Sequence, residues 1–155
     1  MKTKALAAIG SLALTLLASC GVDNSTDSTE LKNIFGTDNR VPMTQTTPPY
    51  SSIGKLTTGC TATLVGQDLI LTAAHCLLGS ISNVYFMPNY MNGSSRSRIA
   101  LTRVWRGTTN PGDDRKNDWA VAKLATPIGQ IYGYMIPKQF NLRPGYKVTL
   151  AGYSG

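Results

Sequence analysis

The sequence predicts an all-β fold, and three observations support this. From Ile53 onward the apolar residues fall in short or alternating runs, which Gly, Pro, Asn and Ser bound. No helix-period segment of useful length follows residue 33. With 155 residues, of which 42% are hydrophobic, the chain can bury one modest core. We therefore expect one globular unit with amino-terminal extensions.

Seven runs in this region are candidate β-strands. Gly66-Gln67-Asp68 fits a hairpin connection between the second and third of them. Residues 91–97 and 107–117 are predicted to be exposed loops, since they are rich in turn-forming residues. The candidate strands are residues 52–57, 61–65, 69–72, 83–87, 99–105, 119–124 and 147–152.

Residues 1–20 predict a signal peptide with a lipobox. Two lysines precede the apolar run 5–18, which is too short to span a bilayer, and small residues follow it. Leu17-Ala18-Ser19-Cys20 resembles the lipobox of bacterial lipoproteins, in which the cysteine is lipidated and becomes the first mature residue. We expect an exported protein, either lipid-anchored at Cys20 to a membrane of the bacterial cell envelope or secreted after ordinary signal cleavage.

Residues 21–33 are polar, with too little apolar surface to offset the entropy cost of ordering, and predict a flexible tether or pro-segment. A second stretch rich in structure-breaking residues, 44–52, precedes the first candidate strand. The domain predicted to fold is therefore contained in residues 34–155.

The chain is basic, with 15 Lys and Arg against 8 Asp and Glu, a net charge of +7. Residues 1–33 hold equal numbers of both signs, so the part from Ile34 onward carries the whole excess. The cations are scattered apart from one cluster, and no nucleic-acid-binding motif is present, so we expect no nucleic-acid partner. Acidic substrates are compatible with this charge. The clustered residues are Arg96, Arg98, Arg103 and Arg106, and a solvated face explains them.

His75 is the single histidine, so any imidazole chemistry must be centred on it. It follows the aliphatic run Leu69-Ile70-Leu71 and the small residues Ala73 and Ala74. Small residues allow a tight turn that presents the ring at a strand end. A histidine in an apolar segment is, however, more often a satisfied core residue, and that interpretation stays open from the residue alone.

Cys60 and Cys76 are the two thiols that remain after Cys20, and an exported protein is expected to oxidise them to a disulfide. In the chain-entropy model the closed loop contributes about 3 kcal/mol to stability. The bridge would attach the strand after Cys60 to the turn that carries His75. A zinc site is disfavoured, because one His and two Cys at this spacing match no common zinc pattern, and no metal or cofactor is expected.

A catalytic histidine needs a carboxylate on its other ring nitrogen, to hold the tautomer and stabilise the imidazolium. Asp118 is the best candidate, because it directly precedes the apolar run Trp119-Ala120-Val121, where a packed backbone can hold a carboxylate still. Asp113 and Asp114 belong to a Gly- and Pro-rich loop and are expected to be solvated.

These motifs together resemble the trypsin/chymotrypsin-like serine proteases. The resemblance is carried by Gly59-Cys60-Thr61, Leu71-Thr72-Ala73-Ala74-His75-Cys76 and Asp118-Trp119-Ala120-Val121. Within the family the likeness is greatest to the bacterial glutamyl endopeptidases, the V8-like enzymes, because of the segment that starts at Ile34 and the turn Gly152-Tyr153-Ser154-Gly155. It covers residues 34–155 and implies the first barrel, and the start of the second, of a chymotrypsin-like double β-barrel.

The resemblance implies a serine endopeptidase that acts on proteins or peptides. His75 would be the general base and then the acid, Asp118 would orient it, and the Cys60–Cys76 bridge would brace the site. Ile34 would be the mature amino terminus, whose ammonium helps to bind the acidic side chain before the cleaved bond. Cleavage before Ile34 would release a domain anchored at Cys20, so the two processing steps would have to follow one another.

The family's serine, in a Gly-Asp-Ser-Gly setting, does not occur in these 155 residues. Ser154 matches the turn ahead of the nucleophile, so it is not expected to act. The sequence thus predicts the front portion of a protease, inactive alone. The alternative is a short product that serves as a non-catalytic binding module or decoy. The residue order excludes an α/β-hydrolase, whose histidine follows its serine, and no well-placed Asp precedes His75 as subtilisin requires.

Overall fold

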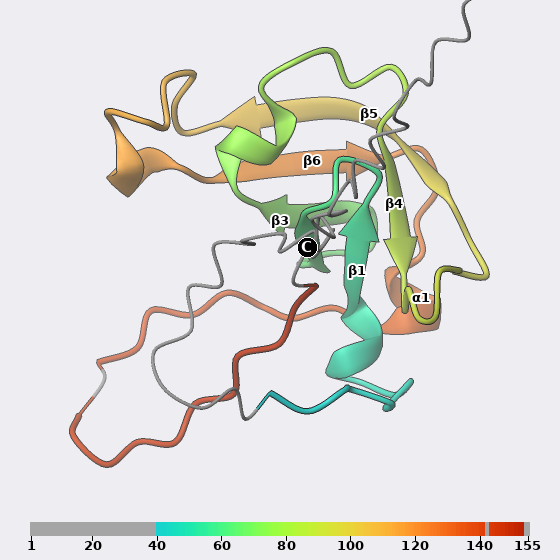
Figure 1. Ribbon diagram of the computed structural model, residues 1–155, viewed down its shortest axis with the longest axis vertical. Coiled ribbons are helices and arrows are strands. Elements are labelled where there is room, and N and C mark those ends of the chain that lie inside the picture. Colours follow the sequence, from blue (N-terminus) through green and yellow to red (C-terminus); the bar gives the residue numbers. More distant parts are fainter. Residues whose placement is uncertain (1–39, 142, 154–155) are drawn as a thin grey trace, which may run out of the picture. The chain divides into compact units, whose positions relative to one another are not determined.

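The computed structural model describes residues 40–141 and 143–153. Within this part, six antiparallel strands close into a barrel in the order β1-β2-β3-β6-β5-β4 (Figure 1). The all-β prediction and the barrel implied by the family resemblance are thereby confirmed. The strands are β1 (Ile53–Leu56), β2 (Thr61–Leu64), β3 (Leu69–Thr72), β4 (Tyr85–Pro88), β5 (Ile99–Arg106) and β6 (Ala120–Leu124).

Short helical turns lie between and after the strands. The one that matters most for the site is η2 (Ala74–Leu77), which directly follows β3 and carries His75. The others are η1 (Tyr50–Ser52), η3 (Arg115–Asn117) and α1 (Gly129–Tyr132). Among the residues that the structure describes, no helix has the length and apolar character needed to cross a membrane.

Alternating side chains fill the barrel interior, as the period of a strand requires. On β2, Ala62 and Leu64 are buried, and on β6 the burial pattern again alternates. Phe86 on β4 is fully buried and packs over Gly54 of β1, where an added Cβ would lie 2.5 Å from the ring. The larger cluster of buried residues comprises Leu56, Ala62, Leu64, Ile70, Ala74, Cys76, Leu77, Val84, Phe86, Ile99, Leu101, Ala120, Ala122, Leu124 and Ile128.

Buried hydroxyl groups in the described part have hydrogen-bond partners. Thr72 Oγ1 donates to the carbonyl of Thr61 on the neighbouring strand at 2.8 Å. Ser51 Oγ donates to the carbonyl of Tyr132 at 2.5 Å, which links η1 to α1. No buried side-chain polar atom of the described residues lacks a partner, so the core costs no unpaired polar group.

Six of the seven expected strands form, with ends that differ by up to two residues. The hairpin between β2 and β3 is present, with the Val65 N–H donating to the Leu69 carbonyl at 2.9 Å. The seventh prediction, residues 147–152, is wrong: this segment forms no ladder with any described residue, and Leu150 is fully exposed. A strand needs a free edge to pair with, and a closed barrel offers none.

Several predicted features lie outside the described residues. They are the signal peptide 1–20 with Cys20, the tether 21–33, the expected amino terminus Ile34, and Ser154.

Candidate active site

His75 lies at the point where the chain leaves β3. Ala73 is extended, with φ −80° and ψ 149°, and the chain then tightens into η2. Ala74 is fully buried and anchors the turn, whereas 58% of the His75 side chain is exposed. The interpretation of His75 as a core residue is therefore wrong, because the small residues before it turn the ring out of the barrel.

Asp118 reaches His75 through the pairing of β3 with β6. Thr72 at the end of β3 lies opposite Ala120 at the start of β6. Since the strands are antiparallel, the residue after the first strand and the residue before the second meet at the same end of the barrel. Asp118 Oδ2 lies 2.7 Å from His75 Nδ1, although the two residues are 43 positions apart.

A second hydrogen bond fixes the carboxylate. The backbone N–H of His75 donates to Asp118 Oδ1 at 2.9 Å, so both oxygens are engaged by the same residue. The side-chain hydrogen bond from His75, followed by the backbone hydrogen bond, lowers the pKa of Asp118 from its ordinary value of 3.8. The carboxylate is thus ionised at neutral pH.

The hydrogen bonds also decide where the imidazole proton lies. An ionised carboxylate has only acceptors, so Nδ1 must donate to it. In the neutral ring, Nε2 then keeps its lone pair and can accept a proton. Because more than half of the side chain is exposed, an external hydroxyl group can approach that nitrogen.

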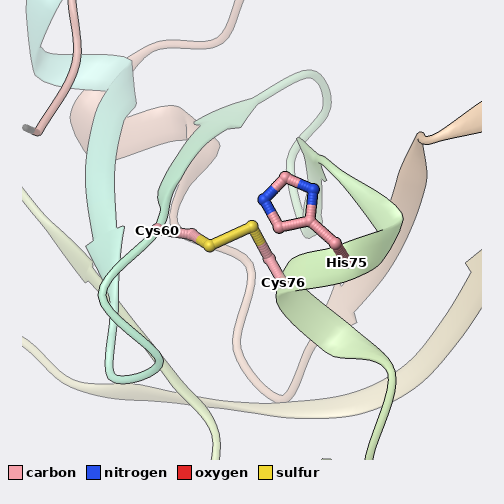
Figure 2. A group of neighbouring side chains, drawn as sticks. All are labelled: Cys60, His75 and Cys76. Carbon is pink, nitrogen blue, oxygen red and sulfur yellow. A yellow bond between two sulfur atoms is a disulfide. The ribbon is translucent and has the colours of Figure 1, made fainter. Parts of the chain in front are cut away.

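A disulfide joins Cys60 to Cys76 and lies beside the ring of His75 (Figure 2). Cys60 directly precedes β2 and Cys76 belongs to η2, with Cα atoms 6.1 Å apart. The bond therefore ties the histidine-bearing turn to the barrel wall.

The same three residues form a compact set of potential metal ligands. The two sulfur atoms and an imidazole nitrogen lie within 4.8 Å of one another. Both sulfurs are committed to the disulfide, so neither is a thiolate that could bind zinc. The set therefore does not fit a metal site, in keeping with the unfavourable spacing.

Asp113 and Asp114 bind within their own loop. Asn110 Nδ2 donates to Asp113 Oδ2 at 2.7 Å, and Asn117 Nδ2 donates to both oxygens of Asp114. Of the three candidate carboxylates, the structure brings Asp118 alone into hydrogen-bond contact with His75.

Arg106 is a supporting residue that sequence reasoning missed. At the end of β5, its Nε donates to the Leu77 carbonyl at 2.5 Å and its terminal nitrogen to the Gly79 carbonyl at 3.3 Å. It thereby holds the carboxyl end of the turn that carries His75. The arginine cluster is thus not simply a solvated face, but nothing in the local sequence marks Arg106 apart from its neighbours.

A family model described as Trypsin matches residues 34–154. The chain belongs to the trypsin family. Among curated proteins, it is 29% identical over 142 residues to the glutamyl endopeptidase of Bacillus licheniformis, covering 81% of this chain and 43% of that protein. A solved structure titled as a Glu endopeptidase in complex with MPD superposes with a TM-score of 0.59 at 28% identity, covering 68% of this chain and 54% of that one. These matches confirm the resemblance to the trypsin/chymotrypsin-like serine proteases and, among them, to the glutamyl endopeptidases.

A shorter match is to inactive serine protease 35 of Mus musculus, 32% identical over 77 residues, 47% of this chain and 17% of that protein. The trypsin-family chain therefore spans less than half the length of either curated relative. The matches therefore show the family and the fold of this chain, and the activity of the whole protein is proposed below.

Proposed function

We propose that this chain supplies the general base of a serine endopeptidase, with His75 as the base and Asp118 as the group that orients it. The observation that carries the proposal is the two-point contact between them, with Nδ1 to Oδ2 at 2.7 Å and the His75 N–H to Oδ1 at 2.9 Å. The substrates are proteins or peptides, as in the family.

In the proposed reaction, His75 Nε2 takes the proton of a serine hydroxyl as its oxygen attacks the scissile carbonyl carbon. The imidazolium, stabilised by the ionised Asp118, then gives that proton to the leaving amine, and water repeats the cycle on the acyl-enzyme. These 155 residues hold no Gly-Asp-Ser-Gly motif, so the serine would come from sequence outside them.

The first test replaces the carboxylate in the complete enzyme. In Asp118→Asn, the amide oxygen would keep the bond from the His75 N–H, and the amide NH₂ would face Nδ1. The ring would then have to protonate Nε2, the wrong tautomer, and we expect turnover to fall about 10⁴-fold. Asp113→Asn is the matched control, since its carboxylate binds Asn110 instead. An equal loss of turnover in both variants would contradict the proposal that Asp118 orients His75.

The single histidine allows a second readout without any hydrolysis. In this chain labelled with ¹⁵N at histidine, we expect the neutral ring of His75 to carry its proton on Nδ1, and the neutral ring in Asp118→Asn to carry it on Nε2. His75→Ala in the complete enzyme should abolish hydrolysis while export and folding persist. Normal turnover in that variant would exclude His75 as the base.

The second candidate function is a non-catalytic binding module or decoy, and a protein described as an inactive serine protease is among the relatives. Reading the DNA after codon 155 separates the two. A frame that encodes Gly-Asp-Ser-Gly supports the enzyme, whereas long noncoding sequence supports the short product.

Finer features of the proposal concern the amino-terminal region and the specificity. Lipidation at Cys20 would anchor the exported protein to a membrane, which Cys20→Ala and fractionation of cells would test. Processing before Ile34 would create an ammonium that binds a Glu or Asp side chain ahead of the scissile bond. Rates on acidic and basic peptides, with and without that processing, test the preference.

A further inference from the structure

A basic groove lies beside the paired strands β1 and β4, outside the His75 site. It encloses about 620 Å³ and is lined by residues 57–59, which lead from β1 to β2, and by residues 93–95 of the loop between β4 and β5. Lys55 and Met87, which are register partners on β1 and β4, also line it. The groove is thus built on the barrel wall.

Two cations and no carboxylate line this groove. Lys55 and Arg98 contribute the positive charge, and none of the other lining residues is Asp or Glu. Neither cation forms an ion pair with another residue of the described chain. An uncompensated pair of cations in a concave site attracts an anionic ligand.

Aromatic rings hold both cations in place. Lys55 Nζ lies 5.1 Å from the ring centre of Tyr90, and Arg98 Cζ lies 4.7 Å from that of Tyr85. Tyr90 is itself in edge contact with the ring of Tyr153 at 5.9 Å. These contacts restrict both long side chains before a ligand arrives, which lowers the entropy cost of binding.

The two turns that line the groove are also fixed. The Gly59 N–H donates to the Leu56 carbonyl at 2.9 Å, and Gly59 has a φ of +99° that favours glycine. Met91 and Ser94 exchange backbone hydrogen bonds of 2.9 and 3.0 Å across the Asn-Gly turn. The groove is therefore preformed.

The groove adjoins the candidate active site through the chain itself. Gly59 directly precedes Cys60, whose sulfur is bonded to Cys76 and lies within 4.8 Å of an imidazole nitrogen of His75. A polypeptide placed against His75 thus has the groove within reach of its next few residues. A concave site of this size suits an extended peptide better than a flat lipid surface.

We propose that this groove binds an acidic stretch of a polypeptide, whose carboxylates contact Lys55 and Arg98. The choice of a polypeptide rests on the proposed endopeptidase function, whereas the preference for anions rests on the groove alone. The two cations invoked are Lys55 on β1 and Arg98 directly before β5, and the ammonium proposed at Ile34 is not one of them.

The test measures peptide binding by the full chain carrying His75→Ala, so that the result does not depend on hydrolysis. The probe is a fluorescein-labelled octapeptide of alternating Ala and Glu, followed by fluorescence anisotropy, with the Ala-Gln peptide as the neutral probe. We expect Lys55→Gln combined with Arg98→Gln to weaken binding of the acidic probe about tenfold. The neutral probe should bind weakly to both proteins.

Lys138→Gln combined with Arg143→Gln is the matched control, since it removes one exposed Lys and one exposed Arg outside the groove. We expect it to change the affinity by less than about twofold. Arg98→Gln alone, at an exposed side chain, should retain the fold and show part of the loss.

Equal losses in the two double variants would overturn the proposal, because net charge would then explain the binding. It would also be overturned if vesicles containing phosphatidylglycerol bound through Lys55 and Arg98 while the acidic peptide did not. Groove-dependent peptide binding together with a complete enzyme that fails to hydrolyse peptides would refute the proposed function and leave this site standing.

Discussion

The barrel and the segment that follows α1 both contain large apolar side chains, yet they expose them to opposite extents. In the barrel, Leu56 and Phe86 are fully buried. In residues 133–153, Phe140 is 61% exposed, Val148 76% and Leu150 fully. Apolar composition alone therefore does not decide burial in this chain.

The backbone explains the difference. Each barrel strand pairs with two neighbours, so its inner face is held against the others. The later segment attaches to β2 through the Met135 N–H, which donates to the Leu64 carbonyl at 2.8 Å, and the Tyr153 N–H, which donates to Thr61 Oγ1 at 2.7 Å. Side chains without an opposing surface stay in water, and clustered exposed apolar residues are typical of surfaces that take part in interactions.

The largest expected effect on stability is at a buried barrel residue, and it tests the contrast between the barrel and residues 133–153. Phe86→Ala removes a fully buried ring and should lower the free energy of unfolding by about 3–5 kcal/mol. Leu150→Ala, at a fully exposed side chain, should change it by less than about 0.5 kcal/mol. Urea denaturation of the full chain measures both values. A comparable loss in Leu150→Ala would show that the segment packs in solution.

A smaller effect is expected at the rim of the barrel, where β5 ends. A Cβ on Gly107 would contact the backbone oxygen of Asn117 and lie 2.5 Å from Trp119 Nε1. Gly107→Ala should cost about 1–3 kcal/mol. Because Asp118 lies between Asn117 and Trp119, Gly107→Ala should also shift the ring resonances of His75.

Gly112→Ala is the control for this variant. It lies in the same loop, and its Cβ would meet a single atom, at 3.9 Å. Unchanged His75 resonances in Gly107→Ala would show that the packing at Gly107 does not determine the position of Asp118.

The smallest effect concerns pH. Hydrogen bonds from His75 lower the pKa of Asp118 below 3.8, so the folded state favours the ionised carboxylate. The resulting stabilisation is fully present above pH 3.8 and is lost as the pH falls through the lowered pKa. The difference in unfolding free energy between the unmodified chain and Asp118→Asn should therefore shrink below pH 3.8.

Denaturation at a series of pH values, with Asp113→Asn as the matched control, measures this dependence. A difference that grew as the pH fell would contradict the lowered pKa of Asp118.

Sequence patterns predicted most of the barrel because alternation reports which face of a strand is buried. The strand predicted at residues 147–152 does not form, although the apolar residues of this run alternate suitably. Strand pairing also needs a free sheet edge, and the local sequence does not reveal whether one is available. The core interpretation of His75 failed likewise, because Ala73 and Ala74 turn the chain before the ring is reached.

The candidate site was predictable in its residue types but not in its supports. His75 was the single imidazole, and Asp118 stood before an apolar run. In contrast, the hold of Arg106 on the Leu77 and Gly79 carbonyls depends on where β5 ends relative to η2. The groove likewise depends on the tertiary structure, because Lys55 and Arg98 come from separate segments and line it together.

By itself, the sequence determined the residues that can carry the chemistry, the alternation that makes strands, and the family to which these motifs belong. Only the tertiary structure decided which carboxylate reaches the imidazole, which nitrogen keeps its lone pair, and which apolar residues are buried. The physical reason is that residue type and local periodicity are properties of neighbours along the chain. Hydrogen-bond partners and burial instead depend on segments that barrel closure brings together from distant positions.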